Sequence, residues 1–153
     1  MGYRSDVRLV LAFPSSTYLA EFRARCELEM LDAPPFTREF WEYGAVEPVV
    51  PTHPSANHLC IYFSWSNVKW YDSFEEIKFV ERMKALCLDC KGAWALGRIG
   101  EDDDDIEIEY DTFDTATEPA PAAGTPEREY STSMYHFVAD DHIRVQRQLE
   151  WVF

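Results

Sequence analysis

The stretch AWALGRIGEDDDDIEIEYDTF, Ala93–Phe113, predicts an apolar strand, an acidic corner and a second strand that pairs with the first or extends it. In the second part, Ile106, Ile108 and Tyr110 alternate with carboxylates, which is typical of a strand with one apolar face. From position 101 to 114, nine of fourteen residues are acidic. We therefore expect a strand whose outward face is almost wholly negative.

Two strands and two helices precede this pair. Val7–Phe13 is an apolar run closed by a proline and predicts a first strand, and His58–Trp65 predicts a central one. Apolar residues at helical spacing predict a helix over Ser15–Leu31. A second helix is expected from the capping box Ser73–Glu76 to the C-x-x-C pair that ends at Cys90, with Gly92 as its stop.

Two further segments have distinct compositions. Residues 32–57 are rich in proline and aromatics, so we expect an ordered, irregular excursion that folds back on the domain, with a short helix at TREFWEYG, Thr37–Gly44. Residues 115–129 have the composition of an exposed loop. The apolar residues near the end lie at odd positions and predict a C-terminal β-hairpin; they are Ile143, Val145, Leu149, Trp151 and Phe153.

The order of these elements predicts an α+β fold. We expect one domain, 1–153, with a mostly antiparallel sheet and two helices packed on one face. A ferredoxin-like arrangement with extra strands and the C-terminal β-hairpin is the closest named architecture. The length and an aromatic content of 15% are sufficient for a real core.

The net charge of −14 is concentrated late in the chain. Residues 1–100 carry 13 acids and 11 bases, whereas residues 101–153 carry 15 acids and three bases. Such a field repels nucleic acid and anionic membranes, so the expected partner is a basic surface, with no direct nucleic-acid or membrane binding. The N-terminus lacks a signal-peptide pattern, and we expect a cytoplasmic protein.

Few features of the sequence point to a catalytic site. No P-loop, nucleophile elbow, H-E-x-x-H or dinucleotide motif is present, so we expect no enzyme activity and no cofactor or metal. The Cys87–Cys90 pair lies at the end of a helix, where packing is a better explanation than redox chemistry. A pocket around Cys60 or His58 is the enzymatic alternative. The acidic run lacks the glycine that an EF-hand loop requires.

The acidic strand favours mimicry of DNA. Alternate side chains along a strand repeat every ~6.6 to 6.8 Å, so Asp103, Asp105, Glu107 and Glu109 would form a line of charge comparable to a row of phosphates. The alternative is a solvated edge that prevents sheet-to-sheet aggregation. The predicted partner-binding residues are Glu101, Asp102, Asp103, Asp104, Asp105, Glu107, Glu109, Asp111 and Asp114.

Three segments carry a resemblance to a known group of proteins. MGYRSDV at the start, NVKWYDSFEEIKFVERM (Asn67–Met83) and RIGEDDDDIE (Arg98–Glu107) resemble segments of small acidic proteins of tailed bacteriophages, over about a third of the chain. The resemblance implies expression in the host bacterial cytoplasm and inhibition of host machinery. It implies no catalytic residues.

The choice of target rests on analogy with acidic inhibitors that mimic DNA. DNA gyrase is the preferred host target, because it holds duplex DNA along a basic channel; CRISPR effectors and restriction enzymes are alternatives. A separate alternative is an interaction or scaffold protein that forms a homodimer or binds a host partner through aromatic residues of the excursion, namely Phe36, Phe40, Trp41 and Tyr43.

Overall fold

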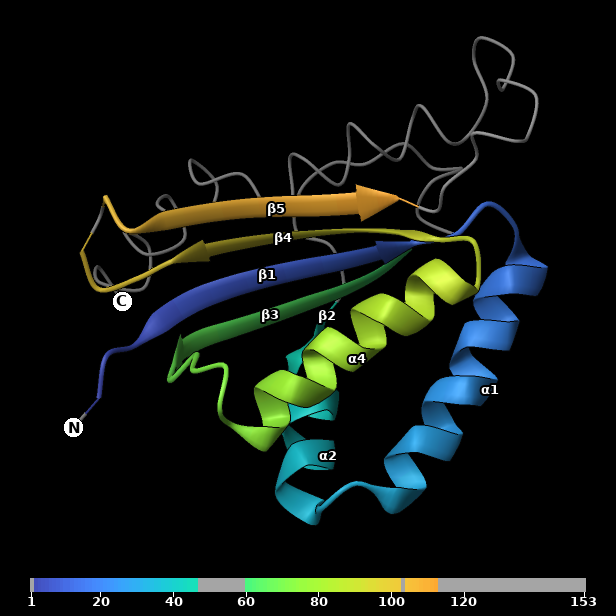
Figure 1. Cartoon of the computed structure of the whole chain (residues 1–153), viewed down its shortest axis with the longest axis horizontal. Helices are drawn as coiled ribbons and strands as arrows, with labels where there is room; N and C mark the ends of the chain where they lie inside the picture. The colour runs from blue at the N-terminus through green and yellow to red at the C-terminus, as the bar shows by residue number, and fades with distance from the viewer. Residues whose placement is uncertain (1, 47–59, 103, 113–153) are drawn as a thin grey trace, which may run out of the picture.

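The computed structural model describes residues 2–46, 60–102 and 104–112 of the 153-residue chain. In these ranges an antiparallel sheet carries three helices on one face (Figure 1). The predicted α+β class, with a mostly antiparallel sheet, is therefore confirmed. Within the same ranges no helix is long and apolar enough to cross a membrane.

Strand β1 (Ser5–Ala12) occupies the centre of the sheet, where the sequence predicted a first strand. It pairs antiparallel with β3 (Cys60–Val68) on one side and with β4 (Ala93–Ile99) on the other. Leu9 and Leu11 point to the helix-covered face, and Val10 and Ala12 point to the opposite face. All four side chains are wholly buried, so both faces of β1 are covered.

The two edges of the sheet differ in length. β2 (Ala45–Val46) pairs with β3 over two residues, and β5 (Ile106–Thr112) pairs with β4 along its whole length. The order is β2-β3-β1-β4-β5. Since β3 and β4 are both antiparallel to β1, they run in the same direction, and the helix between them crosses over β1.

Helix α1 (Ser16–Asp32) agrees with its prediction. The Ser15 side chain accepts a hydrogen bond from the Tyr18 backbone N–H, as an N-cap does. Leu19, Phe22 and Cys26 lie one turn apart and are buried. The spacing of apolar residues therefore placed both the helix and its inner face correctly.

Helix α2 (Pro35–Gly44) forms most of the described part of the excursion and starts two residues earlier than expected, because Pro35 suits the first helical turn. Its aromatics pack on Trp65 of β3, which donates a hydrogen bond to the Phe40 carbonyl at 2.8 Å and stacks on the Phe40 ring at 5.1 Å. Trp41 contacts Phe63 at 4.1 Å between ring centroids. The short helix expected in the excursion is therefore present as a third helix beside the two expected on one face, and its inner aromatics belong to the core.

Helix α4 (Glu75–Asp89) begins later than the predicted capping box. Its N-cap is Phe74, which has no side-chain cap hydrogen bond, so the Ser73–Glu76 capping box is wrong. The backbone forms a turn in which the Phe74 N–H binds the Tyr71 carbonyl. Glu75 and Glu76 in the first turn favour the positive end of the helix dipole instead.

The end of α4 is a Schellman motif. The Gly92 N–H binds the Cys87 carbonyl at 2.9 Å, and the Lys91 N–H binds the Leu88 carbonyl at 3.0 Å. The left-handed residue is Lys91, at a φ of 59°, and not the glycine that was expected to stop the helix. Gly92 is required for space, since a Cβ there would lie 2.6 Å from the Ala12 carbonyl oxygen.

Several expectations fall outside the described ranges or are not confirmed. The C-terminal β-hairpin, the loop 115–129 and residues 47–57 of the excursion lie outside them. The ferredoxin-like detail is not confirmed, because the described order β-α-α-β-β-α-β-β differs from β-α-β-β-α-β. Within the described sheet β3 lies between β2 and β1, so it is an interior strand.

Substitutions at the C-terminal end of α4 distinguish the role of Lys91 from that of Gly92. Lys91→Gly is expected to raise the free energy of unfolding by about 1 kcal/mol, because a left-handed residue with a Cβ is strained. Gly92→Ala is expected to lower it by more than about 1 kcal/mol. Chemical denaturation measures both. Lys91→Ala is the control, because it removes the Lys91 side chain over the Tyr18 ring but keeps the strain; a gain as large as that of Lys91→Gly would contradict the explanation.

Candidate functional site

The acidic hairpin is organised around Arg98 of β4. Its side chain is nearly buried, and each of its guanidinium N–H groups has an acceptor within reach. Nη2 lies 2.9 Å from Asp105 Oδ1 and 3.1 Å from Glu107 Oε1, and Nε donates to Glu107 Oε2 at 3.2 Å. Nη1 donates to the Ser5 hydroxyl at 2.9 Å and to Asp105 Oδ2 at 3.3 Å. One cation therefore holds two of the predicted carboxylates in fixed positions.

Tyr3 ties the N-terminal segment to the same cluster. Its hydroxyl donates to Asp105 Oδ2 at 2.6 Å and accepts from the Asp102 N–H at 3.3 Å, while its backbone N–H donates to the Tyr71 hydroxyl at 2.7 Å. Gly100 is needed here, because a Cβ at this position would collide with the Tyr3 hydroxyl and the Asp105 carboxylate. The corner is thus a packed turn in which Asp105 is anchored to β4 through Arg98 and to the N-terminal segment through Tyr3.

The pKa shifts follow from these contacts. Hydrogen bonds from Arg98 and then from Tyr3 hold the pKa of Asp105 below its ordinary value of 3.8. The hydrogen bond to Asp105 raises the pKa of Tyr3 above 10.0. Burial lowers the pKa of Arg98, but its hydrogen bonds to Glu107 and Asp105 raise it more, so the net shift is upward. At neutral pH Asp105 is therefore a carboxylate beside the Arg98 guanidinium.

The carboxylates of β5 form a row on one face. Glu107, Glu109 and Asp111 are opposite Arg98, Leu96 and Trp94 of β4, so they point to the side of the sheet that carries the helices. All three are exposed. Ile106, Ile108 and Tyr110 point to the other side, which confirms the predicted alternation.

A buried lysine faces this row from α4. Lys84 Nζ lies 2.8 Å from Glu81 Oε1 and 4.0 Å from Glu109 Oε2, and 4.0 Å from the centre of the Trp94 ring. Its side chain is only 5% exposed. The lysine therefore offsets part of the negative charge without reaching the surface.

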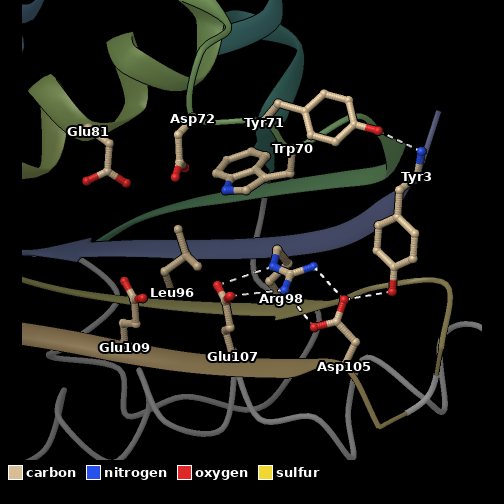
Figure 2. A pocket seen from close by; sticks show the side chains of 10 residues that line it. All are labelled: Tyr3, Trp70, Tyr71, Asp72, Glu81, Leu96, Arg98, Asp105, Glu107 and Glu109. Atoms are coloured by element: carbon tan, nitrogen blue, oxygen red, sulfur yellow. Dashed lines mark hydrogen bonds and ion pairs between the residues drawn. The ribbon is translucent and has the colours of Figure 1, made fainter.

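A pocket of about 440 Å³ opens between α4, β4 and β5 (Figure 2). Five carboxylates and one guanidinium line it, together with Tyr3, Trp70, Tyr71 and Leu96; the charged residues are Asp72, Glu81, Arg98, Asp105, Glu107 and Glu109. The lining has a formal charge of −4, and Trp70 and the two tyrosines supply aromatic walls. Such a hollow suits a cationic side chain better than an anion or an apolar group.

The predicted binding residues take up different places. Glu101, Asp102 and Asp104 are exposed in the turn, and Glu101 accepts a hydrogen bond from the Arg4 N–H. Of the predicted line of four, Glu107 and Glu109 share a face of β5, and Asp105, just before the strand, contacts Arg98 and lines the same pocket as these two. Asp103 and Asp114 lie outside the described residues.

Sequence reasoning missed Asp72, Glu81, Tyr3 and the role of Arg98. Asp72 and Glu81 lie more than fifteen residues before the acidic run and join it only because α4 packs beside β4. Arg98 did carry a signal, since a single base immediately before an acidic run is a natural counter-ion for it. That Arg98 lies opposite Glu107 follows only from the pairing register of β4 and β5.

The cysteines are buried and carry reduced thiols. Burial raises the pKa of Cys60 to about 11 and that of Cys26 to about 11, and it also raises the pKa of Cys87 and Cys90. Raised thiol pKa values are the opposite of what nucleophilic or redox cysteines need. In the part of the chain that the structure describes, no group of three or more His, Cys, Asp or Glu residues is arranged to hold a metal ion.

Comparison with known proteins adds no relative. No protein-family model, no curated protein and no solved structure matches this chain.

The pKa shift of Asp105 predicts that the stability of the protein depends on pH in the acid range. A lowered folded-state pKa contributes stability above the ordinary value of 3.8 and loses it as the pH falls through the lower folded value. Asp105→Asn should therefore be less stable than the wild type at pH 7, with the difference shrinking below about pH 4. Denaturation across pH 2 to 7 measures it, and a constant difference over the range would contradict the explanation.

The pKa shift of Tyr3 predicts that stability also depends on pH in the alkaline range. Its raised folded-state pKa means that the hydroxyl stabilises the protein fully below 10.0 and loses this contribution as the pH rises through the folded value. Tyr3→Phe should therefore lose stability at neutral pH and approach the wild type at strongly alkaline pH. The same denaturation assay above pH 9 tests it, and a gap that widens with pH would overturn it.

Proposed function

We propose that this protein is a non-enzymatic inhibitor that binds a basic DNA-binding surface of a host protein by mimicking DNA. The observation that carries the proposal is the row of exposed carboxylates on β5 beside a pocket with a formal lining charge of −4. A protein that grips DNA through arginine and lysine obtains most of its affinity from sequence-independent electrostatics, so a rigid acidic surface competes for the same groups.

Rigidity of the acidic surface supports the proposal. Exposed carboxylates on a mobile loop would lose side-chain and backbone entropy on binding, which lowers affinity. Here Arg98 and Tyr3 fix Asp105, and strand pairing fixes Glu107 and Glu109. The partner therefore meets a preorganised array.

The spacing of the array also supports it. Glu107, Glu109 and Asp111 repeat along one face of β5 at the ~6.6 to 6.8 Å interval of alternate strand residues. That interval is comparable to the separation of phosphates along a wound nucleic-acid strand. The adjoining pocket adds depth, so an arginine or lysine of the partner finds carboxylates on several sides and an aromatic wall at Trp70.

The host context and target come from the resemblance to small tailed-phage proteins. It supports a role in the cytoplasm of an infected bacterium, and DNA gyrase is the target we prefer, because its DNA channel is long and basic. CRISPR effectors and restriction enzymes have basic grooves of the same kind and would be bound through the same contacts.

The first test removes three charges from the row. The triple variant Glu107→Gln, Glu109→Gln, Asp111→Asn should weaken inhibition of gyrase supercoiling about tenfold or more at low salt, and less as salt rises, because the lost contacts are ionic. The matched control is Glu27→Gln, Glu39→Gln, Glu42→Gln, which changes the net charge equally at exposed sites on α1 and α2. The control should inhibit like the wild type.

Two outcomes would count against the proposal. Equal inhibition by the triple variant and the wild type would remove the β5 row from the mechanism. Equal loss in both triple variants would show that net charge alone matters. If the wild type does not inhibit gyrase, the same pair of variants is compared for displacement of duplex DNA from restriction and CRISPR effectors.

A second candidate function is favoured by exposed aromatics of the excursion. Phe36 is 64% exposed and Tyr43 is 83% exposed, whereas Phe40 and Trp41 pack in the core. Leu28 and Leu31 of α1 are also exposed close to Phe36 in sequence. An interaction protein that dimerises or binds a partner would use these outward side chains.

Size measurement tests this candidate. If the excursion forms a dimer, Phe36→Ser with Tyr43→Ser should return the protein to a monomer in light scattering, because both side chains are solvent-facing and their loss spares the core. Tyr110→Ser, an exposed aromatic on the acidic hairpin, is the control. A wild type that is monomeric at high concentration would contradict the dimer.

A further inference from the structure

The pocket between α4, β4 and β5 carries more negative charge than one positive side chain would neutralise. Its lining has a formal charge of −4 with Arg98 already included. Lys84, which lies outside the lining, contacts Glu81 and Glu109 and reduces this charge to −3. The volume of about 440 Å³ falls in the range of small-molecule sites, ~300 to 1,000 Å³. The pocket therefore has the room and the charge for a small ligand with several positive groups.

The negative charges of the pocket lie on two separate walls. Asp72 precedes α4 and Glu81 belongs to it, whereas Asp105, Glu107 and Glu109 come from the acidic corner and β5. Figure 2 shows these two groups of carboxylates on opposite sides of the pocket. Among the described residues, no three carboxylates converge in a way that could hold a metal ion. A compact ion such as Mg²⁺ needs its oxygen ligands at one point, so the pocket suits an extended cation instead.

An apolar surface separates the two walls. Leu96 and Trp70 lie between the two groups of carboxylates (Figure 2). Leu96 is buried, and the Trp70 ring is held by the rings of Trp65 and Phe40, at 5.5 and 6.2 Å between centroids. A tryptophan ring attracts positive groups, and the same apolar surface can contact methylene groups. The site thus offers negative charge at two ends and apolar contact in the middle.

We propose that this pocket binds a linear aliphatic polyamine. Its ammonium groups would pair with the carboxylates of the two walls, and its methylene chain would cross Leu96 and Trp70. The side chain of an arginine or a lysine has its charge at one end only, so it would leave one wall unpaired. A diamine or a longer polyamine has a charge at each end of an apolar chain and matches both walls.

The polyamine site goes beyond the proposed inhibition of a host protein. Its ligand is a free small molecule, so binding requires no host protein and is measured with the full-length chain alone. The two ideas share one physical origin, because DNA also gathers cations around its phosphates. A surface that resembles phosphates to a DNA-binding protein attracts such cations for the same reason.

Calorimetric titration of the full-length protein tests the site with putrescine, spermidine and MgCl₂. Putrescine and Mg²⁺ both carry two positive charges, so they differ in shape and not in charge. At moderate salt, which screens diffuse attraction, putrescine should bind about tenfold more tightly than Mg²⁺, and spermidine more tightly still. Equal affinities for putrescine and Mg²⁺ would overturn the proposal, because they would show diffuse attraction of counter-ions only.

Two variants locate the binding in the pocket. Asp72→Asn removes an exposed charge from the wall beside α4 and should weaken spermidine binding about threefold or more. Trp70→Leu removes the aromatic surface and should weaken it about fivefold, with circular dichroism to check the fold. The matched control is Glu42→Gln, an exposed residue of α2 that changes the net charge as Asp72→Asn does. It should bind spermidine like the wild type.

The outcomes separate this proposal from the proposed function. Unchanged spermidine binding in Asp72→Asn, or an equal loss in Glu42→Gln, overturns the polyamine site whatever the inhibition assays give. Tighter binding of a capped arginine than of putrescine also overturns it, because it assigns the pocket to a side chain of a partner protein. Asp72 and Trp70 lie outside the β5 row, so the triple variant of that row tests DNA mimicry separately.

Discussion

The fold depends on the double burial of β1. Leu9 and Leu11 on one face and Val10 and Ala12 on the other are all excluded from water. A strand that is apolar on both sides cannot lie at a surface, so it takes the centre of a sheet that needs a layer on each face. The helices provide one layer, which Trp65 and Phe40 join to the sheet through a stacked ring pair and a hydrogen bond. The rest of the sheet, including the acidic edge, is arranged around this constraint.

A strand with many carboxylates is possible because basic groups are placed beneath them. Arg98 spans Asp105 and Glu107, and Lys84 lies between Glu81 and Glu109. Each cation is largely buried, so its field acts on the carboxylates through little water, while the carboxylates keep one side in solvent. The edge therefore stays strongly negative on the outside without unfolding the hairpin by self-repulsion.

β5 is the last strand in the order of the described sheet, and charged side chains on an edge strand discourage pairing with another chain. Protection of an edge does not require a pocket, and it does not require Asp72 and Glu81 to converge on β5 from another element. The convergence of charges from separate segments is what favours binding of a basic partner over simple protection.

Local patterns in the sequence determined the helices, the strands and the acidic alternation, because periods of 3.6 and 2 depend only on neighbouring residues. They placed α1 within one residue at each end, and they identified Glu107 and Glu109 as residues of one face. They misjudged the start of α4, where the turn from Tyr71 to Phe74 replaced the capping box. Only the tertiary structure decided that Arg98 meets Asp105 and Glu107, that Asp72 and Glu81 join the acidic surface, and that Trp41 belongs to the core while Tyr43 does not. These depend on strand register and on how α2 and α4 cross the sheet, which are set by packing between residues far apart in the chain.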